Sequence, residues 1–174
     1  RIVAIKEATG SLVRATQLRA NCPADFALLT GDDPTTLPFM AQGGDGCISV
    51  VSNVAPAEML QMLASISAGQ LARAGELHQQ LTPLAEALFA ESNPIPVKTA
   101  CAWLGLISSA ELRMPLSPLS QFAADQLANA LSQLGRTFER SASPASSLGP
   151  GEVPDRQQAE ASTLEFDLND GVEQ

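Results

Sequence analysis

The 174-residue chain has few aromatic residues and no long apolar run. Aromatic residues make up 4% of it, although hydrophobic residues as a whole make up 45%. The core must therefore be built from Leu, Ala, Ile and Val, which suits helices packed on a buried sheet. No apolar run approaches the ~20 residues that a membrane span needs, and no basic-then-apolar leader directs secretion. We expect a cytoplasmic protein without a membrane partner, of one ordinary domain or one domain with a small appendix.

Cysteine pairs and metal-ligand clusters are also absent. Cys22, Cys47 and Cys101 are odd in number and far apart, with no C-x-x-C pair, so neither a disulfide framework nor a zinc knuckle is predicted. We expect reduced, partly buried thiols. Asp32 and Asp33 could be read as metal ligands, but adjacent carboxylates point in different directions and no third ligand lies at a suitable spacing. The sequence therefore predicts no metal site.

The net charge of -9 is unevenly distributed along the chain. No cluster of basic residues of the kind that binds nucleic acid is present in the sequence. Residues 139–174 hold eight acids and two bases, so most of the negative charge lies there. Residues 141–174 are rich in Ser, Pro, Gly, Gln and acids, which predicts a disordered acidic tail. Within it, Leu164, Phe166 and Leu168 alternate with acids, a pattern that a short strand or a docking motif would also give.

The first part of the chain alternates strand and helix signals with a repeat of roughly 20–25 residues, which implies parallel strands covered by helices. Pro34 at a first helical position makes Asp33 a predicted N-cap, and Ser11 is a predicted N-cap of the helix after the first strand. The predicted strands and helices are residues 2–6, 12–20, 26–30, 37–41, 47–51 and 57–68 in order along the chain. The fold class is therefore α/β, and residues 1–70 have the pattern expected of the last three βα units of a (β/α)8 barrel.

After Gly69 the strand signals stop and helical spacing takes over. Leucines recur at helical intervals through residues 72–89, and residues 97–106 and 120–138 are further helix candidates. Residues 71–140 are therefore predicted to form a helical C-terminal domain. His78, the one histidine, falls in this part and is expected to be a surface or packing residue.

Lys6 occupies a position where an ordinary solvent-exposed surface lysine is not expected. The chain has only one other lysine, Lys98, and Lys6 ends the apolar run of the first predicted strand. A strand in a parallel sheet is covered on both faces, and a side chain at the carboxyl end of a barrel strand reaches the catalytic mouth. Scarce water there disfavours the charged form of the amine, and a neutral amine can attack a ketone. The alternative is a lysine that snorkels out of a strand end.

Two loops near the predicted strand ends have competing interpretations. The glycine-rich residues 43–46 resemble a phosphate cradle but precede a strand, so a plain helix-to-strand turn is favoured. Asn53 follows the third predicted strand and is a candidate for lining the mouth, although Asn is also common in loops. Lys98 lies near a helix start, which argues for a structural or assembly role.

Four segments together resemble the dihydrodipicolinate synthase family of pyruvate-dependent class I aldolases. They are IVAIKEATG at residues 2–10, LLTGDD at 28–33, GGDGCISVVSN at 43–53 and NPIPVK at 93–98. Their order and spacing match across roughly residues 1–138. The lysine motif is typical of the wider pyruvate lyase superfamily, whereas the G-D-D and N-P-I-P-V-K segments favour the synthase branch over sialic-acid lyases.

The resemblance implies a (β/α)8 barrel with a helical C-terminal appendix, usually a homotetramer. Pyruvate is expected to form an imine with Lys6, and the derived enamine to attack the aldehyde of L-aspartate semialdehyde, giving 4-hydroxy-tetrahydrodipicolinate on the route to diaminopimelate and lysine. The resemblance places the main chain of Ile48 against the pyruvate and Gly31 at the mouth, where a missing side chain lets substrate approach. Asp32 is a further mouth-lining candidate. No metal and no organic cofactor are required.

The chain departs from the family in one respect that bears on activity. The family uses a proton-shuttling tyrosine on the strand before the lysine strand, helped by a threonine and a second tyrosine from a dimer partner, and an upstream arginine for the second substrate. This chain has no tyrosine at all, and it begins at Arg1 without an initiator Met. We therefore expect that residues are missing upstream and that the chain alone is inactive. The alternatives are another pyruvate-dependent lyase, such as a sialic-acid or keto-sugar-acid aldolase, and a non-catalytic partial barrel, whether a fragment or a decayed copy.

Overall fold

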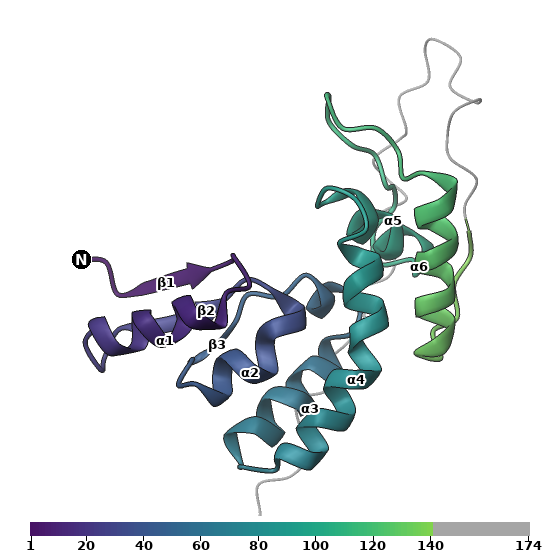
Figure 1. The fold of residues 1–174 in the computed structure, drawn as a ribbon. Coiled ribbons are helices and arrows are strands. Elements are labelled where there is room, and N and C mark those ends of the chain that lie inside the picture. The colour runs from purple at the N-terminus through teal and green to yellow at the C-terminus, as the bar shows by residue number, and fades with distance from the viewer. Residues whose placement is uncertain (141–174) are drawn as a thin grey trace, which may run out of the picture. The chain divides into compact units, whose positions relative to one another are not determined.

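The computed structural model describes residues 1–140 (Figure 1), in which three short strands form a parallel sheet in the order β1-β2-β3. The strands are β1 (Ala4–Glu7), β2 (Ala27–Thr30) and β3 (Gly46–Cys47). Lys6 is the partner of Leu29 in the β1–β2 register, and Thr30 pairs with Cys47 in the β2–β3 register. The parallel βα alternation predicted from the sequence is confirmed. The predicted tail, with its Leu164 to Leu168 pattern, lies outside the described residues.

Helices α1 (Leu12–Asn21) and α2 (Thr36–Ala41) pack over one face of this sheet. The predicted cap is present, because the Ser11 hydroxyl accepts a hydrogen bond of 3.2 Å from the Arg14 amide. A small core forms beneath these helices from Ala15, Leu28 and Phe39. Since side chains alternate along a strand, Lys6 and Leu29 face away from this core.

The prediction of a third strand at residues 47–51 is wrong except at its first residue, Cys47. β3 ends at Cys47, and Val51 begins a 3-10 helix, η2 (Val51–Asn53). The Ile48 amide still donates to the Thr30 carbonyl at 2.8 Å, which continues the ladder for one residue. Beyond Ser49, the amides of Val50 and Val51 donate instead to a carboxylate oxygen of Asp33. This side-chain acceptor replaces a strand partner and turns the chain away from the sheet.

The predicted N-cap role of Asp33 is also corrected. Asp33 is the first residue of a 3-10 helix, η1 (Asp33–Thr35), whose N-cap position is Asp32, and no side-chain hydrogen bond caps that helix. The predicted helix at residues 37–41 is present as α2 and begins one residue earlier. Pro34 at an early helical position remains consistent with a helix start.

The remaining helices are α3 (Pro56–Ser67), α4 (Leu71–Leu88), α5 (Ile95–Trp103) and α6 (Gln121–Gln133). α3 packs along α4, and α4 packs against α6 (Figure 1). The helical spacing predicted for α4 is confirmed, since four leucines along it are buried: Leu77, Leu81, Leu84 and Leu88. α5 begins two residues before the predicted residue 97, and α6 ends at Gln133 rather than at residue 138. Among the described residues no helix is both long and apolar enough to cross a bilayer.

One hydrophobic core joins the last βα unit to the helical part. Met59 and Met62 of α3 pack in the same cluster as Leu77 and Leu81 of α4 and Leu127 of α6. Contacts therefore run across the predicted boundary after residue 70. The division into a barrel part and a helical domain stays a prediction.

Candidate functional site

Lys6 lies near the carboxyl end of β1, and its side chain runs over Gly31. A Cβ atom added at Gly31 would collide with Lys6 Cε and would lie 3.1 Å from Lys6 Cγ and 2.9 Å from Ala8 Cβ. Gly31 directly follows β2, the strand next to β1. The structure therefore brings together two of the predicted site residues, and the missing side chain of Gly31 makes room for the stem of the lysine.

The dry surroundings expected for Lys6 are not formed by residues 1–140. The Lys6 side chain is exposed, and in β1 only Glu7 is buried, so the prediction of a fully buried strand is wrong for this chain. The physical reason is that β1 is an edge strand with β2 as its one partner in the described part. On the face turned away from the Ala15, Leu28 and Phe39 core, Lys6 is exposed and Leu29 is half-buried.

Ile48 follows β3 as Gly31 follows β2, so Lys6, Gly31 and Ile48 come from the carboxyl ends of three neighbouring parallel strands. The Ile48 main chain is held by the hydrogen bond from its amide to the Thr30 carbonyl. Its side chain is 46% exposed. At this end of a parallel sheet, loops converge to form binding sites in α/β proteins.

Asp32 and Asn53 differ in how far they fit the mouth-lining prediction. Asp32 is half-buried, accepts a 2.7 Å hydrogen bond from the Thr35 hydroxyl, and lies beside Gly10 in the loop after β1. It therefore lies next to a second strand-end loop, the one after β1. Asn53 is exposed, and its side-chain amide donates to the Val50 carbonyl within its own turn at 3.0 Å. Its side chain is occupied locally rather than directed to Lys6.

Glu7 is a site residue that the sequence reasoning missed. It is 3% exposed on the helix-covered side of β1. Its carboxylate accepts a 3.0 Å hydrogen bond from the Thr9 amide and lies 3.4 Å from the Arg14 guanidinium. Its main-chain carbonyl accepts a 2.6 Å hydrogen bond from the Gly31 amide. Glu7 thus fixes the loop that follows Lys6 and ties it to Gly31. A charged residue directly after an apolar strand was the available signal.

Asp33 was considered from sequence only as a cap and a metal ligand. It is 5% exposed, and one carboxylate oxygen accepts hydrogen bonds from the Val50 amide at 2.8 Å and the Val51 amide at 3.3 Å. Asp32 and Asp33 therefore bind different partners, a hydroxyl and two amides, and do not converge on one point. Among residues 1–140 no group of three His, Cys, Asp or Glu side chains is arranged to hold a metal.

All three cysteines are free and half-buried, as predicted. Burial raises the pKa of the Cys47 thiol, and the nearby negative charge of Asp33 raises it further, while a contact with Thr36 opposes the shift. Burial also raises the pKa of the Cys101 thiol. Neither thiol is therefore poised as a nucleophile at neutral pH.

The other candidates have structural roles. The loop at residues 43–46 is a turn between α2 and β3, in which Gly43 has a positive φ of 94° and a side chain at Gly44 would collide with Phe39. His78 is half-buried on α4, and its carbonyl accepts a hydrogen bond from the Thr82 hydroxyl. Lys98 donates a hydrogen bond to the main-chain carbonyl of Glu111, which holds the segment after α5.

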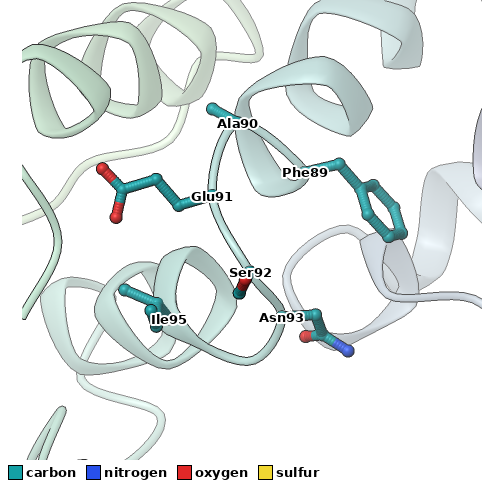
Figure 2. Close-up of a pocket in the computed structure, with 6 residues that line it drawn as sticks. All are labelled: Phe89, Ala90, Glu91, Ser92, Asn93 and Ile95. Atoms are coloured by element: carbon teal, nitrogen blue, oxygen red, sulfur yellow. The ribbon is translucent and has the colours of Figure 1, made fainter. Parts of the chain in front are cut away.

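A shallow hollow lies between α4 and α5, apart from the strand ends. Its lining residues are Phe89, Ala90, Glu91, Ser92, Asn93 and Ile95 (Figure 2). Glu91 and Asn93 point away from each other in this view, and the Glu91 carboxylate accepts a hydrogen bond from the Ser120 amide. The hollow therefore contains no convergent set of reactive groups.

Comparison with known proteins identifies the relatives of this arrangement. The sequence model of the dihydrodipicolinate synthetase family matches residues 1–134. A 4-hydroxy-tetrahydrodipicolinate synthase from Nitratidesulfovibrio vulgaris is 47% identical over 134 residues, which are 77% of this chain and 46% of that protein. The chain thus spans about half the length of the curated relatives it matches.

Solved structures give the same result. The crystal structure of dihydrodipicolinate synthase from Aquifex aeolicus is similar with a TM-score of 0.76 and 39% identity over 79% of this chain and 47% of that one. The synthase from Acinetobacter baumannii, complexed with pyruvate, is similar with a TM-score of 0.73 and 40% identity over 78% of this chain and 46% of that one. Three parallel strands with their helices therefore match part of each of these structures. The chain belongs to the dihydrodipicolinate synthetase family.

Proposed function

We propose that this chain is the C-terminal part of a (β/α)8 barrel, comprising its last three βα units, in a pyruvate-dependent lyase. The reaction joins pyruvate to L-aspartate semialdehyde and gives 4-hydroxy-tetrahydrodipicolinate, in the cytoplasmic synthesis of diaminopimelate and lysine. Membership of the family supports the proposal, as does the pyruvate bound to the Acinetobacter baumannii relative. By the same relationship the working form is a homotetramer.

Lys6 is the proposed nucleophile. Its amine attacks the keto carbon of pyruvate, and loss of water leaves an iminium ion. The iminium withdraws electrons, so a proton leaves the methyl group and an enamine forms. The enamine carbon bonds to the aldehyde carbon of the second substrate, whose oxygen takes up a proton. Hydrolysis or ring closure then releases the lysine. Ile48 is proposed to place its main chain against the pyruvate, and Gly31 to leave room for it.

The observation that carries the proposal is the packing of Lys6 on Gly31. Here the neighbouring strand end has glycine at the position where a Cβ atom would collide with Lys6 Cε. The stem of the lysine lies over this glycine at the strand ends, which supports the proposal that its amine is oriented for attack.

Borohydride trapping tests the proposal, because it reduces an imine with pyruvate to a stable adduct that mass spectrometry locates. Two proteins are needed: the 174-residue chain, and a chimera in which the part of the Nitratidesulfovibrio vulgaris synthase that precedes the shared stretch is joined to Arg1. We expect rapid, stoichiometric labelling of Lys6 in the chimera. We expect little in the chain alone, which has no tyrosine to relay protons. Lys6→Arg should abolish labelling, and Lys98→Arg is the matched control because Lys98 is the other lysine of the chain.

Two outcomes would favour other functions. A folded chimera that forms no adduct supports a non-catalytic partial barrel, which the exposure of Lys6 and the missing tyrosine favour. Labelling that persists in Lys6→Arg would refute Lys6 as the nucleophile. Consumption of a sugar-derived aldehyde instead of aspartate semialdehyde by a labelled chimera indicates a sialic-acid or keto-sugar-acid lyase.

A further inference from the structure

Asp33 is a buried carboxylate that the proposed reaction does not use. Only 5% of it is exposed, yet it has no cationic partner among the ion pairs of residues 1–140. One oxygen accepts the Val50 and Val51 amides at 2.8 and 3.3 Å. The other oxygen, Oδ1, is buried and has no hydrogen-bond donor in the described part of the chain. A carboxylate in this condition is costly to bury.

Packing alone does not explain why an acid occupies this position. Asp33 borders a cavity of about 10 Å³ that is lined mostly by apolar side chains. The other lining residues are Val51, Met59, Met62, His78, Leu81, Thr82 and Ala85. Within residues 1–140 neither His78 nor Thr82 donates a hydrogen bond to Asp33, so an apolar side chain would suit most of these neighbours better than a half-satisfied carboxylate. The carboxylate provides a hydrogen-bond acceptor for the Val50 and Val51 amides, which donate to no strand or helix carbonyl among residues 1–140. Charge-assisted hydrogen bonds of this kind are about twice as strong as neutral ones.

The two amides that Asp33 accepts belong to Val50 and Val51, which follow Ile48 and Ser49 in the chain. On its other side, Ile48 donates its own amide to the Thr30 carbonyl at 2.8 Å. The main chain of Ile48 is therefore fixed between two anchors, and both come from β2 and its loop. That same loop contains Gly31, which Lys6 crosses. One loop thus sets the position of the lysine stem and of the Ile48 main chain together.

We propose that Asp33 is a positioning residue that holds the Ile48 to Val51 main chain in place at the mouth, opposite Lys6 and Gly31. The inference rests on the proposed function, since it assigns Asp33 an indirect role in pyruvate binding at that site. Asp33 does not touch substrate. It acts through the two amides, and its loss releases the loop after β3.

Hydrogen exchange on the 174-residue chain tests the contact itself. Asp33→Asn keeps the shape but removes the charge and leaves an amide nitrogen buried where Oδ1 has no partner. Exchange in the peptide covering residues 46–54 should become about tenfold faster at Val50 and Val51, because a neutral acceptor holds an amide less strongly than a charged one. Peptides from α4 and α6 should keep their rates.

Asp45→Asn is the matched control. Asp45 also uses its carboxylate to accept a main-chain amide, that of Leu28 at 2.8 Å, but this contact lies before β3, at the opposite end of the strand from Ile48. This variant should speed exchange near Leu28 and leave residues 46–54 unchanged. Equal acceleration of every peptide in Asp33→Asn would show a merely structural role, and unchanged exchange at Val50 and Val51 would show that the carboxylate holds nothing. Either result overturns the proposal.

The chimera separates this inference from the proposed function. In Asp33→Asn we expect the pyruvate concentration needed for half-maximal trapping on Lys6 to rise about tenfold, with a smaller change in the rate at saturation, whereas Asp45→Asn should match the parent. An unchanged pyruvate requirement in Asp33→Asn would overturn the positioning role. If the parent chimera forms no adduct, the proposed function fails, and the exchange measurements still decide whether Asp33 fixes this loop.

Discussion

Replacing Gly31 with Ala separates the cost to the fold from the cost to the chemistry. The new Cβ atom would collide with Lys6 Cε and would lie 2.9 Å from Ala8 Cβ. Crowding of this kind costs about 1–3 kcal/mol in a packed site. Gly31 does not have a positive φ, so the backbone accepts Ala, and the reduced freedom of the unfolded chain returns about 0.4–1 kcal/mol. Because Lys6 and Ala8 are exposed and can shift, we expect a net loss of only about 1 kcal/mol.

The chemical effect should be much larger. The lysine stem must leave its path over the glycine, and a displacement of about 1 Å at a reacting group lowers rates on the order of 10²-fold. The assay is the initial rate of borohydride trapping with pyruvate in the chimera, beside thermal melting of the same samples. Gly46→Ala is the control, since a Cβ atom there lies 3.4 Å from Leu29 and makes an ordinary contact. A folded Gly31→Ala variant that traps pyruvate at the parent rate would refute the reasoning.

Three further predictions concern stability and thiol reactivity. Leu127→Ala should lower the free energy of unfolding by about 2–5 kcal/mol in urea titrations, because Leu127 is fully buried at the centre of the α3, α4 and α6 core. Gly75→Ala should raise it by about 0.5–1 kcal/mol in the same assay, since Gly75 lies inside α4 and a Cβ atom there meets nothing within 4 Å. Alkylation of Cys47 should need a higher pH than that of a free cysteine, because burial and the charge of Asp33 raise its pKa. The sign for stability follows, since a thiol that keeps its proton longer when folded makes the fold less stable as the pH rises through that range. A pH series with iodoacetamide and peptide mapping checks the first effect, and urea titrations at the same pH values check the second.

The elements that sequence predicted well are those whose pattern is local. The leucine spacing of α4 and the Ser11 cap of α1 depend on residues a few positions apart, and both are present. The strand predicted at residues 47–51 failed because its continuation was decided by Asp33, which lies 17 residues before Val50. An apolar run such as CISVV cannot by itself distinguish a strand from a segment that a distant acceptor turns aside.

The functional-site residues also divide into those that local sequence predicted and those that depend on distant neighbours. Lys6 and Gly31 were predicted from their motifs, and the structure places one against the other. The surroundings of Lys6 were predicted less well, because burial of a strand depends on neighbours that the strand's own sequence does not contain. Asp33 was missed as an anchor since it acts on main-chain amides, which every residue has, so no partner residue type marks the contact. Glu7 was missed although its charge directly after an apolar strand was a signal; its carboxylate contacts both the Thr9 amide and the Arg14 guanidinium.

The single core shared by α3, α4 and α6 has a consequence for how this family's chains can be shortened or recombined. A break after residue 70 would strip Met59 and Met62 of the leucines that cover them and would leave α4 with an uncovered apolar flank. Exchanging helical C-termini between relatives therefore requires the crossover to fall before β3, because Val51, Val54 and Ala55 belong to the same core and Cys47 packs against it, so that both sides of this core descend from the same parent.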